Sequence, residues 1–179
     1  MNKFVFYLSF LFFSCDDNAG LIPVQNSSPI IEVLDKDRSI ELNKNWSKDE
    51  SFKIDAYCKR QGWIMTKTAS GIFYSIVKKG NGVVFPSVED EVTIDYEVRL
   101  LDVNQTLCYS SEEYGSAVFK VEKSLVESGL HEAITYLNVG DSAVVVLPHF
   151  LAHGIAGNVD KIPPLSPVLY YLSVVDVKN

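Results

Sequence analysis

The stretch 124–148 constrains the fold more than any other, because it joins the pattern of one short helix to that of one buried strand. Apolar residues recur at helical spacing in its first half and form a single stripe. Residues 142–147 are rich in Val and end at Pro148, which is typical of a strand. A helix with one apolar stripe needs a sheet to cover it, so we expect the two to pack together. The stripe consists of Val126, Leu130, Ala133, Ile134 and Leu137.

A few residues set the expected limits of this helix. Ser124 and Glu127 have the spacing of a capping box, which predicts a helix start at Ser124. Gly140 can end the helix. Gly129 inside it costs roughly 1 kcal/mol relative to Ala, so we expect another part of the chain to approach the backbone there.

Alternating residues predict the strands of the sheet. From 92 to 101 apolar side chains alternate with polar ones, as in a half-buried antiparallel strand. The sequence therefore predicts an α+β fold, in which a twisted antiparallel sheet curls around the helix at 125–138. Further strands are expected at 63–67, 72–77, 118–121 and 168–177.

The first residues have the pattern of an export signal. Lys3 precedes an apolar run from Phe4 to Phe13, too short to span a bilayer but suited to a secretory signal. The run ends in Ser14-Cys15, and a small residue before a Cys resembles a bacterial lipoprotein signal. Residues 1–14 would then be removed and Cys15 acylated. The alternative is a plain signal peptide with an incidental Cys.

Between this signal and the sheet we expect two further segments. Residues 15–46 are polar and mixed, which indicates a lipid-anchored tether holding the domain off a membrane. Ser47 and Glu50 again have capping-box spacing and predict a helix that ends near Gly62. Residues 47–70 then form a helical extension with the first strand, and the helix is expected to pack on the back of the sheet.

The charge of the chain and the spacing of its reactive residues argue against nucleic-acid binding, a metal site and hydrolase chemistry. The formal net charge is −7 and there is no basic run, which argues against nucleic acid as a partner. No His and Cys pair has metal-ligand spacing, so no metal is expected. No nucleophile stands beside a base, so a hydrolase is disfavoured. Cys58 and Cys108 could form a disulfide in an exported protein, but the sequence favours two separate buried thiols.

Several short motifs follow one another in a specific order. They are Gly129-Leu130-x-Glu132-Ala133, Val139-Gly140-Asp141, Leu147-Pro148, Ala152-His153-Gly154 and Ile162-Pro163-Pro164. Together they resemble the FKBP family of peptidyl-prolyl isomerases. The resemblance runs from Gly71 to the C-terminus and implies an isomerase domain at 71–179. It also implies the FKBP-like form of the predicted sheet around one helix.

The resemblance implies a site as well as a fold. An isomerase of this kind needs no cofactor and no covalent step, because a dry apolar pocket favours the twisted X–Pro amide over the planar one. The expected catalytic walls are Tyr96, Ile162 and Tyr170, with His153 as a hydrogen-bond donor. The expected substrate-binding residues are Tyr109, Phe119, Val126, Glu127 and Leu130.

The sequence departs from the family pattern at several of these positions. Cys108-Tyr109 replaces the usual Phe-Asp, and Ala117 replaces a Phe. Glu127 stands where an aliphatic residue is usual, and His153 where a Tyr is usual. Leu130 takes the place of a frequent Trp floor. An alternative function is therefore a catalytically weak or inactive binding module of the same fold, acting as a holdase or as part of a cell-surface machine.

The overall layout is loosely similar to isomerase lipoproteins associated with gliding motility. It implies an exported protein that is anchored to a membrane by a lipid, on the periplasmic side or at the cell surface. The expected partners are proline-containing exported polypeptides and the membrane.

Overall fold

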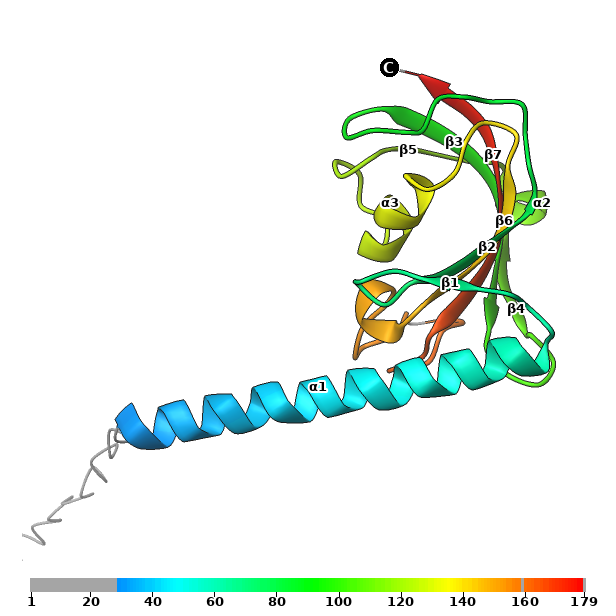
Figure 1. The fold of residues 1–179 in the computed structure, drawn as a ribbon. Coiled ribbons are helices and arrows are strands. Elements are labelled where there is room, and N and C mark those ends of the chain that lie inside the picture. The colour runs from blue at the N-terminus through cyan, green and yellow to red at the C-terminus, as the bar shows by residue number, and fades with distance from the viewer. Residues whose placement is uncertain (1–28, 159, 179) are drawn as a thin grey trace, which may run out of the picture. The chain divides into compact units, whose positions relative to one another are not determined.

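The computed structural model describes residues 29–158 and 160–178 (Figure 1). Seven strands in this part of the chain form one sheet, in which every pair of neighbours is antiparallel. The order is β1-β2-β6-β7-β3-β4, and β5 also pairs with β3. The strands are β1 (Thr66–Lys67), β2 (Phe73–Lys78), β3 (Glu91–Leu100), β4 (Leu107–Ser110), β5 (Ala117–Lys120), β6 (Ser142–Leu147) and β7 (Val168–Lys178). The helices are α1 (Pro29–Arg60), α2 (Ser111–Tyr114), α3 (Ser128–Ile134) and the 3-10 helix η1 (His149–Leu151).

Strand β3 organises the sheet. It pairs with β7 over its whole length, from Glu91 opposite Lys178 to Leu100 opposite Val168. Its other edge is shared, because β5 covers the first half of β3 and β4 covers the second half. The predicted alternation holds, with Val92, Ile94 and Val98 buried between more exposed polar residues. The split edge brings α2 beside β3, which the sequence did not predict.

Helix α3 lies on the concave side of the curved sheet (Figure 1). Its apolar residues Leu130, Ala133 and Ile134 join the same buried cluster as Val92 and Ile94 of β3. The predicted arrangement of one short helix wrapped by an antiparallel sheet is therefore confirmed.

The predicted limits of this helix are wrong. Helix α3 begins at Ser128 with Glu127 as its N-cap, and no side chain caps it. Ser124 Oγ instead accepts a hydrogen bond from the N–H of Lys120 at 2.9 Å, closing the turn after β5. The helix ends at Ile134 rather than near Gly140. The side chain of Ser124 satisfies a nearby backbone group in a turn, which competes with capping.

Gly129 is confirmed as a point of close approach. A Cβ atom there would lie 2.8 Å from the carbonyl oxygen of Leu151 and 2.8 Å from Cδ2 of Leu147. Only a residue without a Cβ lets α3 pack so closely on β6 and η1. This contact also fixes η1, which leads into the loop that carries His153.

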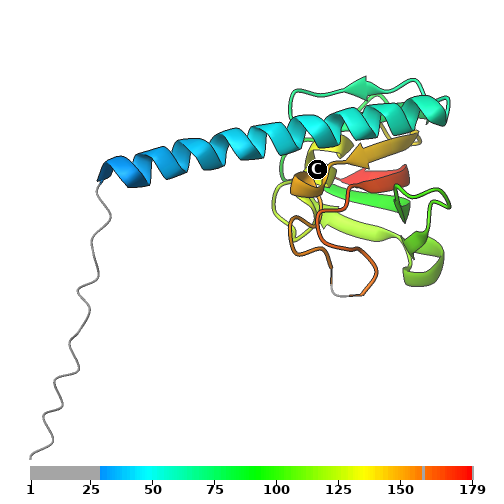
Figure 2. The same cartoon turned by 90° about the horizontal axis from the view of Figure 1, so that it is seen from below.

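The other face of the sheet is covered by the C-terminal part of α1, which crosses the strands (Figure 2). Ile54 and Cys58 are buried with Phe73, Val146 and Leu169 in a second cluster. The predicted packing of this helix on the back of the sheet is confirmed.

The predicted helix start at Ser47 is wrong, because the structure has α1 begin at Pro29. Between residues 30 and 60 no Gly or Pro interrupts the chain, and Pro is well suited to a first helical position. Of the two compact units into which the chain divides, the second, Ile40–Asn179, holds the whole sheet. None of the described helices combines the length and the apolarity that crossing a membrane requires.

Asp141 ties the end of β2 to the turn that precedes β6. Its side chain is buried, with one carboxylate oxygen accepting from the N–H of Gly80 at 2.7 Å. The other oxygen accepts from the N–H of Asn138 at 2.8 Å. The Val139-Gly140-Asp141 motif is thus a structural clasp within the fold.

The two cysteines that the structure describes are both free. Cys58 lies in the cluster behind the sheet and Cys108 in the cluster in front of it, so the expectation of two separate buried thiols is confirmed. The predicted signal at 1–14, Cys15 and the start of the tether lie outside the described residues.

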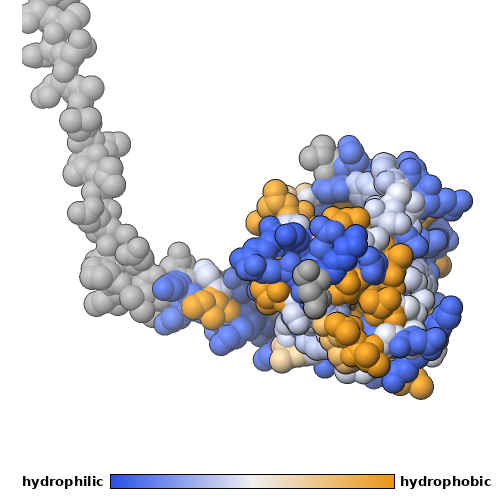
Figure 3. Space-filling view, turned by 90° about the horizontal axis from the view of Figure 1, so that it is seen from above, coloured by the Kyte–Doolittle hydropathy of each residue, from blue (hydrophilic) through white to orange (hydrophobic). Residues whose placement is uncertain are grey.

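The exposed surface carries apolar side chains at several places. Figure 3 shows one face, on which hydrophobic patches are interspersed with hydrophilic residues. Val103, Leu125 and Ile64 are among the most exposed large apolar side chains. Single exposed apolar residues are ordinary on soluble domains and do not by themselves mark a site.

Candidate active site

A cavity of about 200 Å³ lies between the sheet and α3. Strands β3 and β7 supply one wall, through Tyr96 and Tyr170, and α3 supplies Leu130. The residues just before α3 and the loop after η1 complete it. Apart from one carboxylate, one imidazole and the tyrosine hydroxyls, the lining is apolar. It consists of Ile94, Tyr96, Val98, Tyr109, Ala117, Val126, Glu127, Leu130, His153 and Tyr170.

Most of the predicted site residues meet at this cavity. Tyr96, Tyr170 and His153 line it, as do the expected substrate-binding residues Tyr109 and Leu130. Val126 and Glu127 line it as well. These side chains come from separate parts of the sequence, and the sheet brings them together because β3 pairs with β7.

Ile162 and Phe119 are not among the residues that line this cavity, so their places in the site stay predictions. Ile162 is 1 % exposed within the main core, where its N–H donates to the side-chain oxygen of Asn158. Phe119 is 3 % exposed, and its ring stands edge-on to the imidazole of His131. The sequence pattern placed both correctly as apolar, inward-facing residues, but that pattern is the same for a core residue and a wall.

Glu127, His153 and Tyr170 form a polar group within the apolar cavity. Nε2 of His153 lies 3.0 Å from a carboxylate oxygen of Glu127. Burial raises the pKa of Tyr170 well above its usual range, and the charge of Glu127 and a hydrogen bond to it raise it further. The Tyr170 hydroxyl therefore stays protonated and donates to the Glu127 carboxylate. Nε2 of His153 is engaged by Glu127, which leaves Nδ1 as the free nitrogen of that ring.

Tyr109 is held by a residue that the sequence analysis missed. The Asn158 side-chain oxygen accepts three backbone N–H groups, those of Asp160, Lys161 and Ile162. This fixes the orientation of the amide, so that its Nδ2 donates to the hydroxyl oxygen of Tyr109. With that oxygen already accepting, the hydroxyl proton of Tyr109 is free to donate into the cavity. The turn-forming character of Asn was the only sequence signal for this role.

Burial also changes the acidity of Tyr96. Its pKa is raised, first by burial and then by the nearby Tyr114, Glu127 and Glu113. The hydroxyl therefore remains a neutral hydrogen-bond donor. The main-chain N–H of Tyr96 donates to the Ser111 hydroxyl at 3.1 Å, which couples β3 to α2 beside the cavity.

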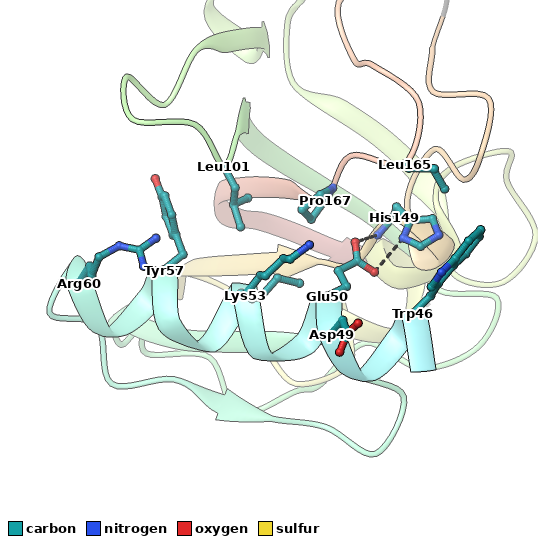
Figure 4. A pocket seen from close by; sticks show the side chains of 11 residues that line it. Trp46, Asp49, Glu50, Lys53, Tyr57, Arg60, Leu101, His149, Leu165 and Pro167 are labelled. Atoms are coloured by element: carbon teal, nitrogen blue, oxygen red, sulfur yellow. Dashed lines mark hydrogen bonds and ion pairs between the residues drawn. The ribbon is translucent and has the colours of Figure 1, made fainter. Parts of the chain in front are cut away.

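A second cavity, of about 520 Å³, lies between α1 and the ends of the strands (Figure 4). Glu50 reaches across from α1 and accepts from the main-chain N–H of His149 at 2.9 Å. Its other oxygen lies 2.7 Å from Nδ1 of the same residue. This double contact anchors η1 to α1, and it leaves neither group free for chemistry. We assign the second cavity a structural role and the smaller one the functional role.

The smaller cavity can bind but is poorly suited to covalent chemistry. It offers aromatic and aliphatic walls, neutral tyrosine hydroxyls and one carboxylate paired with an imidazole. Its size suits one small ring and part of its neighbouring residue. Such a site can favour one shape of an uncharged group by excluding water and donating a few hydrogen bonds.

Comparisons with known proteins point to the same region. Residues 82–175 match the FKBP-type peptidyl-prolyl cis-trans isomerase family. The chain is 27 % identical over 172 residues to an FKBP-type peptidyl-prolyl cis-trans isomerase FkpA of Buchnera aphidicola, covering 92 % of this chain and 66 % of that protein. It is 32 % identical over 142 residues to a probable FkpA of Neisseria meningitidis, covering 78 % and 51 %. It is 31 % identical over 147 residues to the outer membrane protein MIP of Legionella longbeachae, covering 79 % and 60 %. The chain thus spans between half and two thirds of the length of these relatives.

Proposed function

The chain belongs to the FKBP-type peptidyl-prolyl cis-trans isomerase family, and from this premise we propose that it catalyses cis–trans isomerisation of X–Pro bonds in exported polypeptides. The observation that carries the proposal is the apolar cavity walled by Tyr96, Leu130 and Tyr170. Its lining comes from both sides of the sheet–helix interface, within the residues that match the family.

The reaction needs a place where the twisted amide is more stable than in water. Rotation about the X–Pro bond has a barrier of roughly 18–20 kcal/mol, because resonance keeps the amide planar. In the twisted state resonance is lost and the carbonyl becomes less polar. An apolar cavity that excludes water therefore binds the twisted state better than the planar state, which lowers the barrier.

Hydrogen-bond donors in the cavity add to this effect. The tyrosine hydroxyls of Tyr96 and Tyr109 can each donate to a substrate carbonyl and so orient the chain on both sides of the proline. Tyr109 occupies the place where the family pattern has an acidic residue. Because it carries a hydroxyl on a large ring, it can fill the space and still donate a hydrogen bond.

The test is the isomerisation of proline peptides and the refolding of a protein whose folding is limited by proline. Tyr96→Ala should lower kcat/KM by about tenfold or more, which corresponds to roughly 1.4 kcal/mol of transition-state stabilisation. His153→Phe should have a milder effect, because its Nε2 is already engaged. Tyr136→Ala is a matched control, because this ring stacks on Tyr74 and does not line the cavity. It should keep kcat/KM within about twofold of the wild type.

A binding module of the same fold is the second candidate, and one observation favours it. Glu127 and His153 place a carboxylate in contact with an imidazole in a cavity that is otherwise mostly apolar, which weakens the desolvation on which catalysis depends. If the folded wild-type protein does not accelerate X–Pro isomerisation with any of several residues preceding proline, the proposed enzyme activity is wrong. Retained binding of proline peptides under those conditions would identify the module.

We also propose that the protein is exported and anchored through Cys15. The support is the apolar run followed by Ser14-Cys15, together with the relative that is named an outer membrane protein. Radioactive fatty acid should label the wild type and leave Cys15→Ala unlabelled. Equal labelling of the two proteins would contradict lipid attachment at this residue.

A further inference from the structure

We propose that Glu127 makes the cavity selective for X–Pro bonds in which the residue preceding proline is lysine or arginine. The proposal rests on the isomerase activity proposed above and adds the class of substrate. Its basis is the placement of one carboxylate among the residues that line the cavity.

The backbone holds Glu127 at this position. It is the N-cap of α3, with φ −59° and ψ 137°, and its carbonyl accepts from the N–H groups of Leu130 and His131 at 2.9 Å and 3.2 Å. Its side chain is 17 % exposed, so it lies mostly out of water. A mostly buried carboxylate interacts more strongly with a nearby charge than an exposed one does.

Few groups around the cavity can neutralise this carboxylate. Among the residues that the structure describes, no lysine or arginine lines the cavity, and Glu127 is the only acidic residue that does. Its partners are the imidazole of His153 and the hydroxyl of Tyr170, which is neutral. On the β4 and α2 side, Lys161 lies over the rings of Tyr109 and Tyr114.

Lys161 is paired with a different carboxylate, that of Glu113. Nζ of Lys161 lies 3.9 Å from a carboxylate oxygen of Glu113, and both side chains are well exposed. Glu113 and Glu127 both raise the pKa of Tyr96, after burial and Tyr114, so the two carboxylates act together on this wall. Beside the cavity the cation of Lys161 is paired with Glu113, so the carboxylate of Glu127 is left without a lysine or arginine partner among the described residues.

A cation on the substrate would find a partner here, and an anion would be repelled. The residue preceding proline shares the rotating bond, so its side chain lies beside the cavity when proline is inside. We expect kcat/KM for a lysine peptide to exceed that for a norleucine peptide by about tenfold, since the carboxylate is partly screened by solvent and by His153. The glutamate peptide should be slower than both.

The experiment compares three peptides that differ only in the residue preceding proline: lysine, norleucine and glutamate. Norleucine has the same stem as lysine and lacks the charge. The full-length protein is measured beside Glu127→Gln, which keeps the shape and the hydrogen-bonding oxygen. Glu127→Ile is a second variant in case the amide disturbs folding. Glu41→Gln removes the same charge from an exposed position on α1 and controls for net charge.

The ratio of kcat/KM between the lysine and norleucine peptides is the readout. It should fall to within about twofold of unity in both Glu127 variants and stay at the wild-type value in Glu41→Gln. In the wild type, 0.5 M salt should lower it in part, on the order of twofold to threefold. An equal ratio in the wild type and the Glu127 variants would overturn the selectivity and leave the isomerase intact. Inactivity towards all three peptides would overturn the isomerase itself, and the selectivity with it.

Discussion

Replacing Gly129 by Ala tests the packing that positions the cavity. Gly129 is buried in α3, where it faces β6 and η1. Its added Cβ would lie 2.8 Å from the main-chain oxygen of Leu151 and 3.0 Å from Cβ of the same residue. It would also lie 2.8 Å from Cδ2 of Leu147, which is the end of a flexible side chain and can turn away.

Two effects oppose each other in this variant. Ala is the better helix former, by about 1 kcal/mol. Against this, the Leu151 backbone is held by η1 and cannot turn away, and overpacking of a buried contact costs about 1–3 kcal/mol. Because part of the clash is with backbone, we expect an overpacking cost of about 2–3 kcal/mol, in the upper part of that range, and hence a net destabilisation of about 1–2 kcal/mol. For a folded unit of this size the Tm should fall by about 3–8 °C.

The assay is thermal unfolding followed by circular dichroism, with isomerase activity measured on the same samples. Ser128→Ala is the matched control, since Ser128 is the exposed neighbour on the same helix. Its stability should change by less than about 0.5 kcal/mol. Gly129→Ala should also lower kcat/KM, because shifting η1 moves the loop that carries His153. A Tm equal to or above that of the wild type would refute the argument that close approach requires glycine here.

Three further outcomes are expected. Asp141→Asn should lower the free energy of unfolding by about 2–3 kcal/mol, measured in urea, because one of the two backbone N–H groups that the buried carboxylate accepts from then faces an amide NH₂. The same change at the exposed Asp176 should cost little, and equal effects of the two variants would contradict the clasp. Ile162→Ala should lower the free energy of unfolding by about 2–5 kcal/mol, because Ile162 is a buried core residue. If this variant keeps its stability and loses as much kcat/KM as Tyr96→Ala, Ile162 instead contacts the substrate. Burial raises the pKa of Cys58 from its usual 9.0 to about 11, so at pH 8 its alkylation in the folded protein should be about a hundredfold slower than that of a small thiol, as peptide mass mapping can measure. The same shift implies stability that is complete below pH 9 and declines as the pH rises towards 11, and alkylation as fast as that of the small thiol would show that the residue is not buried.

Sequence patterns were sufficient for most of the elements. The alternation in β3 predicted a strand because one face of the strand meets the core and the other is more exposed, and the Val-rich run of β6 predicted a strand that is buried on both faces. The apolar stripe predicted that α3 packs on the sheet, and the helical cost of Gly129 predicted a close neighbour. Helix limits were less predictable. Ser124 had the spacing of a cap, yet it bonds to Lys120 in a turn, and only the path of the chain decides between those two uses.

Predicting the site residues needed both the sequence motifs and the tertiary structure. The ordered motifs indicated which side chains belong to the cavity, including Tyr96, Tyr170 and His153. They did not separate Ile162 from the wall residues, because inward-facing apolar residues look alike in sequence whether they border a void or fill the core. The role of Asn158 was not visible either, since its amide acts on Tyr109 across 49 residues of chain.

The sequence by itself determined the sheet, the single packed helix and the family, because these follow from local periodicity and from motifs in a fixed order. Only the tertiary structure separated the cavity lining from the buried core and decided which polar groups of the lining contact one another. Glu127, His153 and Tyr170 come from a helix end, a loop and the last strand, and nothing local in the sequence indicates that they meet. Their contacts arise because the sheet and α3 bring the three segments to the same cavity, and among the described residues that line it Glu127 is the one carboxylate.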